Sequence, residues 1–285
     1  MKKLMALLLA MAMVFAFAAC GDDSATPETT KPEATDPTQP EGTDPTEPAD
    51  PAVPQKVTVY IPASIAIEYP NGIEYPNGAV YGPAEIVYEE NWQTKDSFLT
   101  SYSIEIAGMK LENKITYGNK SAKTETSGVQ VETVIDENGR TVKQTSYGAI
   151  GTGMEKSETV NVYDAQGRLI KETTTTKYTS VETLEEHVVE YVITETADGS
   201  EGRAVMGNAT MVNVYDKQHR QIATITIVDG VETSKVEMTY DEAGNLVTQK
   251  TYNMGTLQTT ITYTYKTAEI SAEKAEQLPQ FVRVK

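Results

Sequence analysis

The residues best spaced to do chemistry are four aspartates that each stand three positions before a glycine or a histidine. The pairs are Asp136 and Gly139, Asp164 and Gly167, Asp216 and His219, and Asp241 and Gly244. Carboxylate oxygens are calcium ligands, and Asp136-Glu137-Asn138 gathers several, but a calcium site usually needs six or more oxygens. The other turns offer fewer, and one contains Lys217. The sequence therefore predicts that each aspartate hydrogen-bonds its own turn and that no metal is bound.

The sequence gives little support for a catalytic or metal-binding histidine, because the chain contains only two histidines, in unrelated contexts. Glu185-Glu186-His187 lacks the second histidine that a zinc-binding helix motif requires, so His187 is predicted to be a surface residue of a strand. His219 occupies the glycine position of its turn, and histidine is enriched at positive φ. The sequence shows no nucleophile–base set, phosphate loop or dinucleotide glycine pattern. We therefore expect no catalytic residue, no cofactor and no enzyme activity.

Cys20 is the only cysteine, so the folded part has neither a disulfide nor a thiol nucleophile. It follows two lysines and sixteen apolar residues (4–19), a length that is short for a membrane-spanning helix and typical of a signal peptide. Phe17-Ala18-Ala19-Cys20 resembles a lipoprotein lipobox, with Phe17 in place of the more usual Leu. The resemblance implies removal of residues 1–19, lipidation of Cys20 and anchoring on the extracellular face of a bacterial membrane. A plain secretory leader is the alternative.

Residues 20–55 contain the anchor cysteine and then a segment rich in Pro, Thr, Asp and Glu. A segment with so few apolar side chains cannot bury a core, so it is predicted to be a disordered stalk. Repeated prolines and like charges keep such a chain extended. The stalk implies that the folded part stands clear of the membrane.

The four Asp-containing turns join predicted β-strands. Residues 231–240 alternate between apolar and polar side chains up to the turn, which predicts a hairpin. Asp suits the first corner of a type I turn, and Gly suits the left-handed position after it. In that geometry Asp241 pairs with Asn245, and Tyr240 faces Leu246 across the strands. A second turn class, clearest at Asp229-Gly230, alternates with the first.

Chained hairpins of this kind predict an all-β fold, a curved antiparallel meander. The turn aspartates are 28, 52 and 25 residues apart, and the long interval predicts a degenerate copy. Because twist accumulates over many strands, we expect an open half-barrel-like sheet, with a two-layer sandwich as the alternative.

The β domain is predicted to span residues 56–268. Its first strand begins at Lys56 and is expected to stop at Pro62, and a later strand is expected over 186–196. The tail, 269–285, is predicted to carry a short helix capped by Ser271.

The pattern Tyr-Asp-x-x-Gly-Arg/Asn-Leu resembles the YD repeat, also called the RHS repeat, of bacterial cell-surface proteins. Residues 163–169 and 240–246 match it best, and 135–141 and 215–221 match it weakly. The resemblance implies β-hairpins at a cell surface and specifies an activity poorly. Large proteins of this kind enclose a C-terminal toxin, whereas this chain is more similar to small lipid-anchored proteins with a few YD repeats.

Aromatic side chains supply the candidate contact residues. Trp92 is predicted to lie in a loop, and Tyr69 and Tyr75 stand in tandem copies of Ile-Glu-Tyr-Pro-Asn-Gly at 67–72 and 73–78. These three side chains are predicted to contact a partner. An inert insertion is the alternative for the duplicated loop, and most other tyrosines are expected to pack between strands.

The formal net charge of −17 repels nucleic acid and anionic lipid headgroups, so no nucleic-acid partner is expected. The predicted function is a non-catalytic binding, adhesion or structural role at the cell surface, with a surface protein or a glycan as partner. The alternative is a carrier that holds a lipid or a small hydrophobic ligand on the concave face of the sheet. A carrier needs an apolar concavity open to solvent, whereas a binder shows a filled core and an exposed contact patch.

Overall fold

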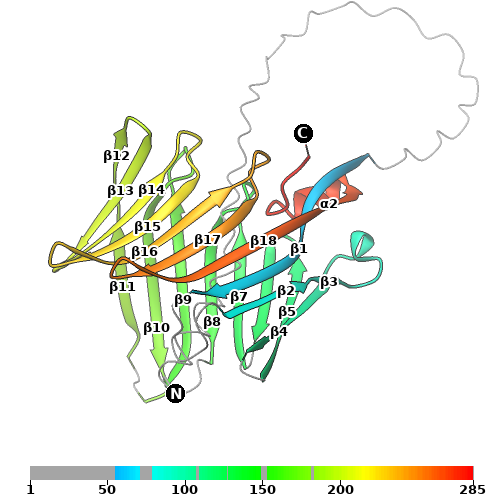
Figure 1. Cartoon of the computed structure of the whole chain (residues 1–285), viewed down its shortest axis with the longest axis horizontal. Coiled ribbons are helices and arrows are strands. Elements are labelled where there is room, and N and C mark those ends of the chain that lie inside the picture. The colour runs from blue at the N-terminus through cyan, green and yellow to red at the C-terminus, as the bar shows by residue number, and fades with distance from the viewer. Residues whose placement is uncertain are drawn as a thin grey trace, which may run out of the picture.

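The computed structural model describes residues 55–70, 79–106, 109–126, 128–148, 153–180 and 183–284. These residues form two antiparallel sheets of nine strands each, together with one short α-helix and one 3-10 helix. The predicted all-β meander is confirmed, and its strands are divided between two sheets that do not close into a barrel. We name the two sheets A and B. Figure 1 shows sheet A in front of sheet B, with the strands of the two sheets crossing obliquely.

Sheet A contains strands from both ends of the described chain. In spatial order they are β12 (Val192–Thr196), β13 (Gly199–Met206), β14 (Ala209–Tyr215), β15 (Gln221–Val228), β16 (Val231–Tyr240), β17 (Leu246–Asn253), β18 (Thr256–Ser271), β1 (Lys56–Tyr69) and β2 (Ala79–Glu85). All neighbours are consecutive in the sequence except β18 and β1. The pairing of these two long strands joins the start of the described chain to its end.

Sheet B is a meander in which every neighbour is consecutive. In spatial order its strands are β11 (Glu185–Glu190), β10 (Leu169–Tyr178), β9 (Met154–Tyr163), β8 (Thr141–Tyr147), β7 (Val129–Ile135), β6 (Ser121–Thr126), β5 (Met109–Gly118), β4 (Phe98–Ile106) and β3 (Val87–Tyr88). Two of the strands, β6 and β13, have sequences that do not by themselves favour a strand. Their Ser, Ala, Lys, Glu and Gly residues have low β-propensity, and pairing on both sides stabilises them as strands.

The chain passes between the sheets at Tyr191, inside the long interval between Asp164 and Asp216. No Asp-x-x-Gly turn lies in the described residues of this interval, and the degenerate copy expected there stays a prediction. The predicted strand 186–196 is therefore two edge strands, β11 and β12, in different sheets. Tyr191 is buried, and its N–H donates to the carbonyl of Ile170 at 2.9 Å.

Pro62 does not end the first strand, contrary to the prediction. β1 continues to Tyr69 and pairs with β18 on one side and β2 on the other. The register against β18 shifts between Pro62 and Ser64, and a bulge is a position where a residue without an N–H is tolerated within a sheet. The carbonyl of Pro62 accepts a hydrogen bond from the Tyr88 hydroxyl at 2.8 Å, which ties β1 to the start of sheet B.

The predicted C-terminal helix is present as α2 (Ala272–Gln277), and the Ser271 hydroxyl accepts from the Lys274 N–H at 3.1 Å. The predicted domain boundary at 268/269 falls inside β18, and the residues after it belong to the core. Leu278 is fully buried, and Phe281 is 5% exposed. The described part of the chain contains no helix with the length and hydropathy needed to cross a membrane.

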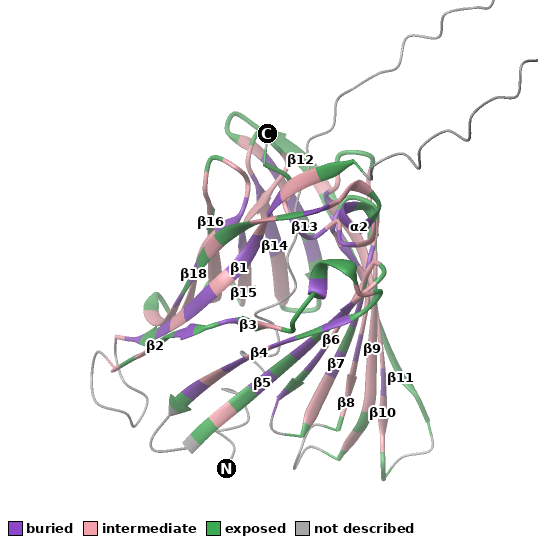
Figure 2. Cartoon of the chain, turned by 90° about the vertical axis from the view of Figure 1, so that its right-hand side faces the viewer, coloured by how far each residue is buried: buried purple, intermediate pink, exposed green. Residues whose placement is uncertain are grey.

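The larger hydrophobic core lies where β1 and β18 meet β4 and β5, with α2 and the following tail against it. The rings of Phe98 and Tyr117 stack with centroids 5.1 Å apart, and Phe281 packs edge-on against Tyr117. A smaller core of Val189, Tyr191 and Ala204 joins the sheets at the opposite corner. Figure 2 shows buried segments on β1, β4 and β5, whereas β8 to β10 are mostly of intermediate burial.

Candidate functional site

The four Asp-x-x-Gly/His segments are tight turns between consecutive strands. They join β7 to β8, β9 to β10, β14 to β15 and β16 to β17. In each turn the aspartate carbonyl accepts from the N–H three residues later at 2.9–3.1 Å, and the aspartate N–H donates to the carbonyl four residues later at 2.9 Å. The predicted left-handed position is present in all four, with φ of 77° at Gly139, 86° at Gly167, 60° at His219 and 97° at Gly244.

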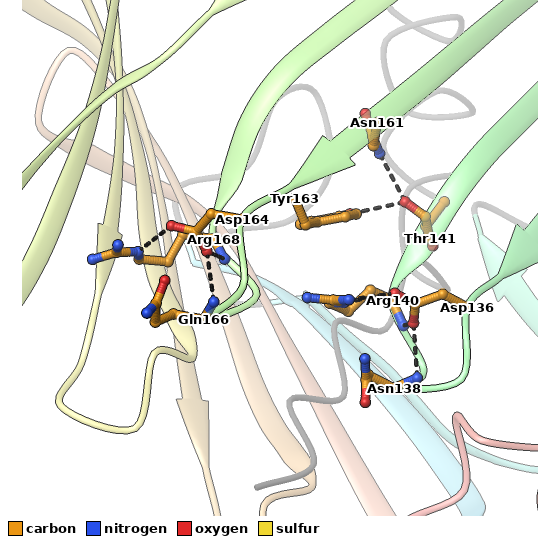
Figure 3. Close-up of polar contacts among 9 residues, drawn as sticks. All are labelled: Asp136, Asn138, Arg140, Thr141, Asn161, Tyr163, Asp164, Gln166 and Arg168. Atoms are coloured by element: carbon orange, nitrogen blue, oxygen red, sulfur yellow. Dashed lines mark hydrogen bonds and ion pairs between the residues drawn. The ribbon is translucent and has the colours of Figure 1, made fainter.

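Each aspartate side chain accepts hydrogen bonds from backbone N–H groups of its own turn and from the side chain of the residue four positions later. In the first three turns, Oδ1 accepts from the backbone N–H groups two and four residues on, at 2.9–3.0 Å. Oδ2 accepts from an arginine Nε at 2.7–2.8 Å, in the pairs Asp136–Arg140, Asp164–Arg168 and Asp216–Arg220. Charge-assisted bonds of this kind are about twice as strong as neutral ones. Figure 3 shows the first two of these arrangements, which we term turn clasps.

The fourth turn clasp replaces arginine by an amide. Asn245 donates its backbone N–H to Asp241 Oδ1 at 2.8 Å and its Nδ2 to Asp241 Oδ2 at 2.9 Å. Tyr240 faces Leu246 across the hairpin. Both features agree with the prediction from the sequence.

Neighbouring clasps in sheet B are connected by the tyrosine that precedes the second aspartate. The Tyr163 hydroxyl donates to the carbonyl of Thr141 at 2.8 Å (Figure 3). The guanidinium carbon of Arg140 lies 4.9 Å from the centroid of the same ring. Tyrosine therefore supplies both an aromatic face for the cation and a hydroxyl donor, which gives a physical reason for Tyr before Asp in the repeat.

Sheet A repeats this connection between its two clasps. The Tyr240 hydroxyl donates to the carbonyl of Gln221 at 2.9 Å, and Arg220 lies 5.0 Å from the Tyr240 ring centroid. Tyr265 of β18 then donates to the carbonyl of Leu246 at 2.9 Å. In all three connections the accepting residue directly follows the Arg or Asn of the preceding clasp.

The second and third clasps are linked across the two sheets. The Leu169 N–H donates to the Tyr215 hydroxyl at 3.0 Å, and Arg168 forms an ion pair with Glu195 of β12 in addition to its clasp with Asp164. The side chain of Arg168 is only 10% exposed. The turn clasps thus form one connected series that runs from sheet B to sheet A.

This bonding pattern leaves the clasp aspartates little capacity for a ligand, because both carboxylate oxygens accept hydrogen bonds from the turn itself. Among the described residues, no group of three or more His, Cys, Asp or Glu side chains is arranged to hold a metal ion. His187 is exposed on β11, opposite Thr174. The geometry of the clasps is that of a structural device.

The side chains on the inward face of sheet B change from apolar to polar between β5 and β10. Ile115 of the core is in register, strand by strand, with Thr124, Val131, Ser146, Ser157 and Thr176. We use the name polar inner wall for the residues of β8 to β10 on this face: Gln144, Ser146, Ser157, Thr159, Asn161, Glu172, Thr174 and Thr176. All except Thr176 are only half-buried.

Hydrogen bonds within the polar inner wall satisfy many of its groups but not all. The hydroxyls of Thr159 and Thr174 are 3.0 Å apart. Asn161 donates through Nδ2 to the Thr141 carbonyl at 3.0 Å (Figure 3), whereas its Oδ1 is buried without a protein partner. Burial raises the pKa of the Glu172 carboxyl, and burial together with the Glu172 charge raises the pKa of Tyr191 to about 12.

Sheet A presents a matching polar cluster on its own inward face. The Gln221 amide donates to Asn213 Oδ1 at 2.9 Å and to the Thr224 hydroxyl at 2.7 Å. Amide and hydroxyl groups of this kind hydrogen-bond polar ligands and disfavour apolar ones.

The predicted contact residues lie elsewhere. Trp92, in the 3-10 helix η2 (Trp92–Thr94), is 5% exposed and packs against Phe98, with ring centroids 4.9 Å apart. Tyr69 is 7% exposed and packs edge-on against Tyr81. Both are core residues, which corrects the prediction that they face a partner, because their large apolar surfaces are stabilised by burial between the sheets. Cys20 and Tyr75 lie outside the described residues.

The clasp arginines are the residues whose role the sequence interpretation missed. Arg140, Arg168 and Arg220 belong to the repeat pattern, but no role follows from the pattern alone. The sequence feature that could have revealed this role is the recurrence of Arg or Asn four positions after each of the four aspartates, since both side chains can donate to a carboxylate.

Comparisons with known proteins identify no family. No protein-family model matches the chain, and no curated protein matches it. Among solved structures, a porin-like protein from Bacteroides uniformis is similar at a TM-score of 0.38 and 11% sequence identity, over 72% of this chain and 98% of that one. This distant similarity supports no functional assignment.

Proposed function

We propose that this chain is a lipid-anchored protein of the bacterial cell surface whose β domain binds a partner without catalysis. The observation that carries the anchor is Phe17-Ala18-Ala19-Cys20, which follows the apolar residues 4–19 and precedes the Pro/Thr/acidic stalk. An anchor, a spacer and a folded head in this order are typical of proteins displayed outside the membrane.

The side chains on the inward faces support a hydrophilic partner, either a surface protein or a glycan. The polar inner wall consists of amides, hydroxyls and one carboxyl, half-buried rather than filled by apolar packing. The alternative, a carrier of a lipid or hydrophobic ligand, needs an apolar concave surface, and the apolar inward residues are packed into the core with α2. The binding role is therefore preferred.

The turn clasps support kinship with YD repeats. The same donors and acceptors recur in four turns, and the Tyr, Asp, Gly and Arg positions of the pattern each have a physical role in them. A repeated structural clasp fits a scaffold that presents a surface.

The anchor is tested by replacing the one cysteine. The chain produced from Met1 in a Gram-positive host is expected to partition into the membrane and detergent phase and to show the added mass of acyl chains, and Cys20→Ser is expected to abolish both. Asp22→Asn is the matched control and should behave as the native chain. Membrane retention of Cys20→Ser at the native level would contradict the anchor.

The binding role is tested separately, with cell-wall polysaccharide and phospholipid as competing probes. The native chain is expected to bind polysaccharide or a surface protein on intact cells. Thr159→Val/Thr174→Val is expected to weaken binding, because it removes two hydroxyls of the polar inner wall. Native mass spectrometry that finds a co-purified phospholipid, with no binding to cells, would favour the carrier instead.

A further inference from the structure

The polar inner wall contains one carboxyl group, and no group of the described residues neutralises it. Glu172 lies on the inward face of β10, because Val189, its cross-strand partner on β11, belongs to the small core between the sheets. The side chain is half-buried, and burial alone raises its pKa, with no hydrogen bond or cation from the described residues to offset the effect. A desolvated carboxylate without a partner is unfavourable, so Glu172 is a position where a ligand can supply a missing cation.

A second acceptor without a partner stands on the neighbouring strand. Asn161 of β9 is directly opposite Glu172 in the antiparallel register, and the Cβ atoms of such a pair lie about 5 Å apart. Asn161 Nδ2 donates to the Thr141 carbonyl, as Figure 3 shows, whereas Oδ1 is buried and accepts no hydrogen bond from the protein. Two adjacent side chains therefore offer acceptors, and the group that both lack is a donor.

The charged and titratable groups around this pair favour a positively charged ligand. The polar inner wall contains neither lysine nor arginine, and the nearby clasp arginines, Arg140 and Arg168, are each held by the aspartate of their own turn. Glu185 and His187 of β11 share the inward face and are exposed at its rim. Tyr191 is the neighbour whose pKa responds to the charge of the wall carboxyl. An anion would find no unpaired cation among these groups, whereas a cation would find a carboxylate.

The hydroxyls beside Glu172 favour a ligand that carries hydroxyl groups of its own. Thr159 and Thr174 form one hydroxyl pair at 3.0 Å, and Ser157 and Thr176 form another at 3.3 Å. Within each pair one hydroxyl donates to the other, so one O–H of each pair is left to bond a third group. Across β8 to β10 such positions extend over about 10 Å. A lysine side chain would set its aliphatic stem against these groups and leave them without partners, whereas a sugar would bond them.

We propose that the polar inner wall binds a glycan with free amino groups, whose ammonium bonds Glu172 and Asn161 and whose hydroxyls bond the neighbouring Ser and Thr pairs. An ammonium group has three N–H donors, enough for the carboxylate and for Asn161 Oδ1 together. The formal net charge of −17 also attracts a cationic ligand over a longer range. This inference rests on the proposed binding role and names the chemistry of the partner.

Two oligosaccharides that differ only at the amine test the proposal. A glucosamine oligomer and an N-acetylglucosamine oligomer of the same length are titrated calorimetrically into the chain produced from Met1 and purified in a mild detergent. The free-amine oligomer is expected to bind tighter by on the order of tenfold or more, because only its amine pairs with the carboxylate. Glu172→Gln should remove this preference and leave the affinity for the acetylated oligomer unchanged. Thermal unfolding of the same sample checks that the variant is folded.

A matched control separates the site from the overall charge of the protein. Glu186 is exposed on β11 and opposite Thr175, on the face of sheet B that points away from the polar inner wall. Glu186→Gln changes the net charge by the same amount as Glu172→Gln and should leave both affinities at the native level. An equal loss in the two variants would overturn the proposal, because it would show attraction by net charge alone.

The pH dependence identifies the carboxyl that pairs with the amine. Because burial raises the pKa of Glu172, the affinity for the glucosamine oligomer should rise between about pH 5 and about pH 7, as this carboxyl ionises. Glu172→Gln should flatten the rise. His187→Gln, which removes the titrating group at the rim, should retain it. A rise that is lost in His187→Gln and kept in Glu172→Gln would overturn the assignment.

The remaining outcomes distinguish this inference from the proposed function. Equal affinity for the two oligomers in a native chain that still binds cells or neutral polysaccharide would overturn the inference and leave the binding role intact. Tighter binding of an oligolysine of equal charge would assign the wall to a cationic peptide instead. A native chain that binds neither oligomer nor intact cells would overturn both.

Discussion

The two ends of the molecule are stabilised by different means. At the end formed by β1, β18, β4 and β5, buried aromatic and aliphatic side chains from both sheets form the larger hydrophobic core. At the end formed by β8 to β10, the inward side chains are mostly polar and half-buried, and a turn clasp connects each hairpin to the next. The comparison shows that one antiparallel meander can combine hydrophobic burial at one end with charge-assisted bonding at its turns.

The difference has energetic consequences. Large side chains removed from water contribute roughly 1.5–3 kcal/mol each, and a hydrogen bond contributes about 1 kcal/mol net. The packed end should therefore dominate global stability, whereas the clasped end should fix the register and order of the hairpins. Substitutions in the two regions test this division.

The largest effect is expected in the packed end. Trp92→Ala should lower the free energy of unfolding by about 3–5 kcal/mol, because it removes a buried ring and leaves a cavity beside Phe98. Thr159→Ala in the polar inner wall is the comparison and should cost about 1 kcal/mol or less. Denaturant unfolding followed by tryptophan-independent circular dichroism measures both. An equal loss of unfolding free energy in the two variants would contradict the expectation that the packed end dominates global stability.

Replacing a clasp aspartate should cause the second-largest loss of stability. Asp164→Ala should destabilise the chain by about 2–3 kcal/mol, because two N–H groups lose their acceptor and Arg168, nearly buried, loses one of its two carboxylate partners. Asp241→Ala, whose partner is the neutral Asn245, should cost about 1–2 kcal/mol. Thermal unfolding of the two variants side by side gives the difference. A larger loss in Asp241→Ala would show that the arginine adds nothing to the clasp.

The tyrosine that connects two clasps should have a smaller effect. Tyr163→Phe keeps the ring beneath Arg140 and removes only the hydrogen bond to the Thr141 carbonyl, so the expected cost is about 1 kcal/mol. Tyr163→Leu removes the aromatic face as well and should cost more. Hydrogen exchange of β8 and β9 amides should increase locally in Tyr163→Phe, and unchanged exchange would show that the connection contributes nothing.

The smallest effect is a dependence on pH at Glu172. Burial raises the pKa of this carboxyl in the folded state, so the ionised form is disfavoured there and stability falls as pH rises from the ordinary carboxyl range through the raised pKa. Glu172→Gln should therefore be more stable than the native chain at pH 7 and equal to it at acidic pH. Thermal unfolding at a series of pH values measures this.

Glu158 is the control of opposite sign. Hydrogen bonds from Lys156 and Lys143 lower its pKa, so its ionised form is favoured by folding. Glu158→Gln should lower the melting temperature slightly at pH 7, with the difference fading as the pH falls below the ordinary carboxyl range. The same direction of change in both variants would contradict the assigned environments.

Local patterns predicted the turns well. The Asp and Gly positions, the pairing of Asp241 with Asn245 and the cap at Ser271 follow from short-range chemistry, and the structure contains each of them. Proline at position 62 misled the prediction, because a bulge lets β1 continue past it. Trp92 and Tyr69 were also beyond local inference, since a loop tryptophan is exposed or buried according to which distant strands reach it.

The sequence by itself determined the all-β class, the positions of the Asp-containing turns and the composition of the leader and stalk, because these depend on neighbours a few positions apart. Only the tertiary structure decided that the meander divides at Tyr191 into two sheets and that β1 pairs with β18. It also placed Arg140 over the ring of Tyr163 and Arg220 over the ring of Tyr240. These features depend on pairing between residues tens of positions or more apart, and the register of such pairs is set by the packing of the whole fold.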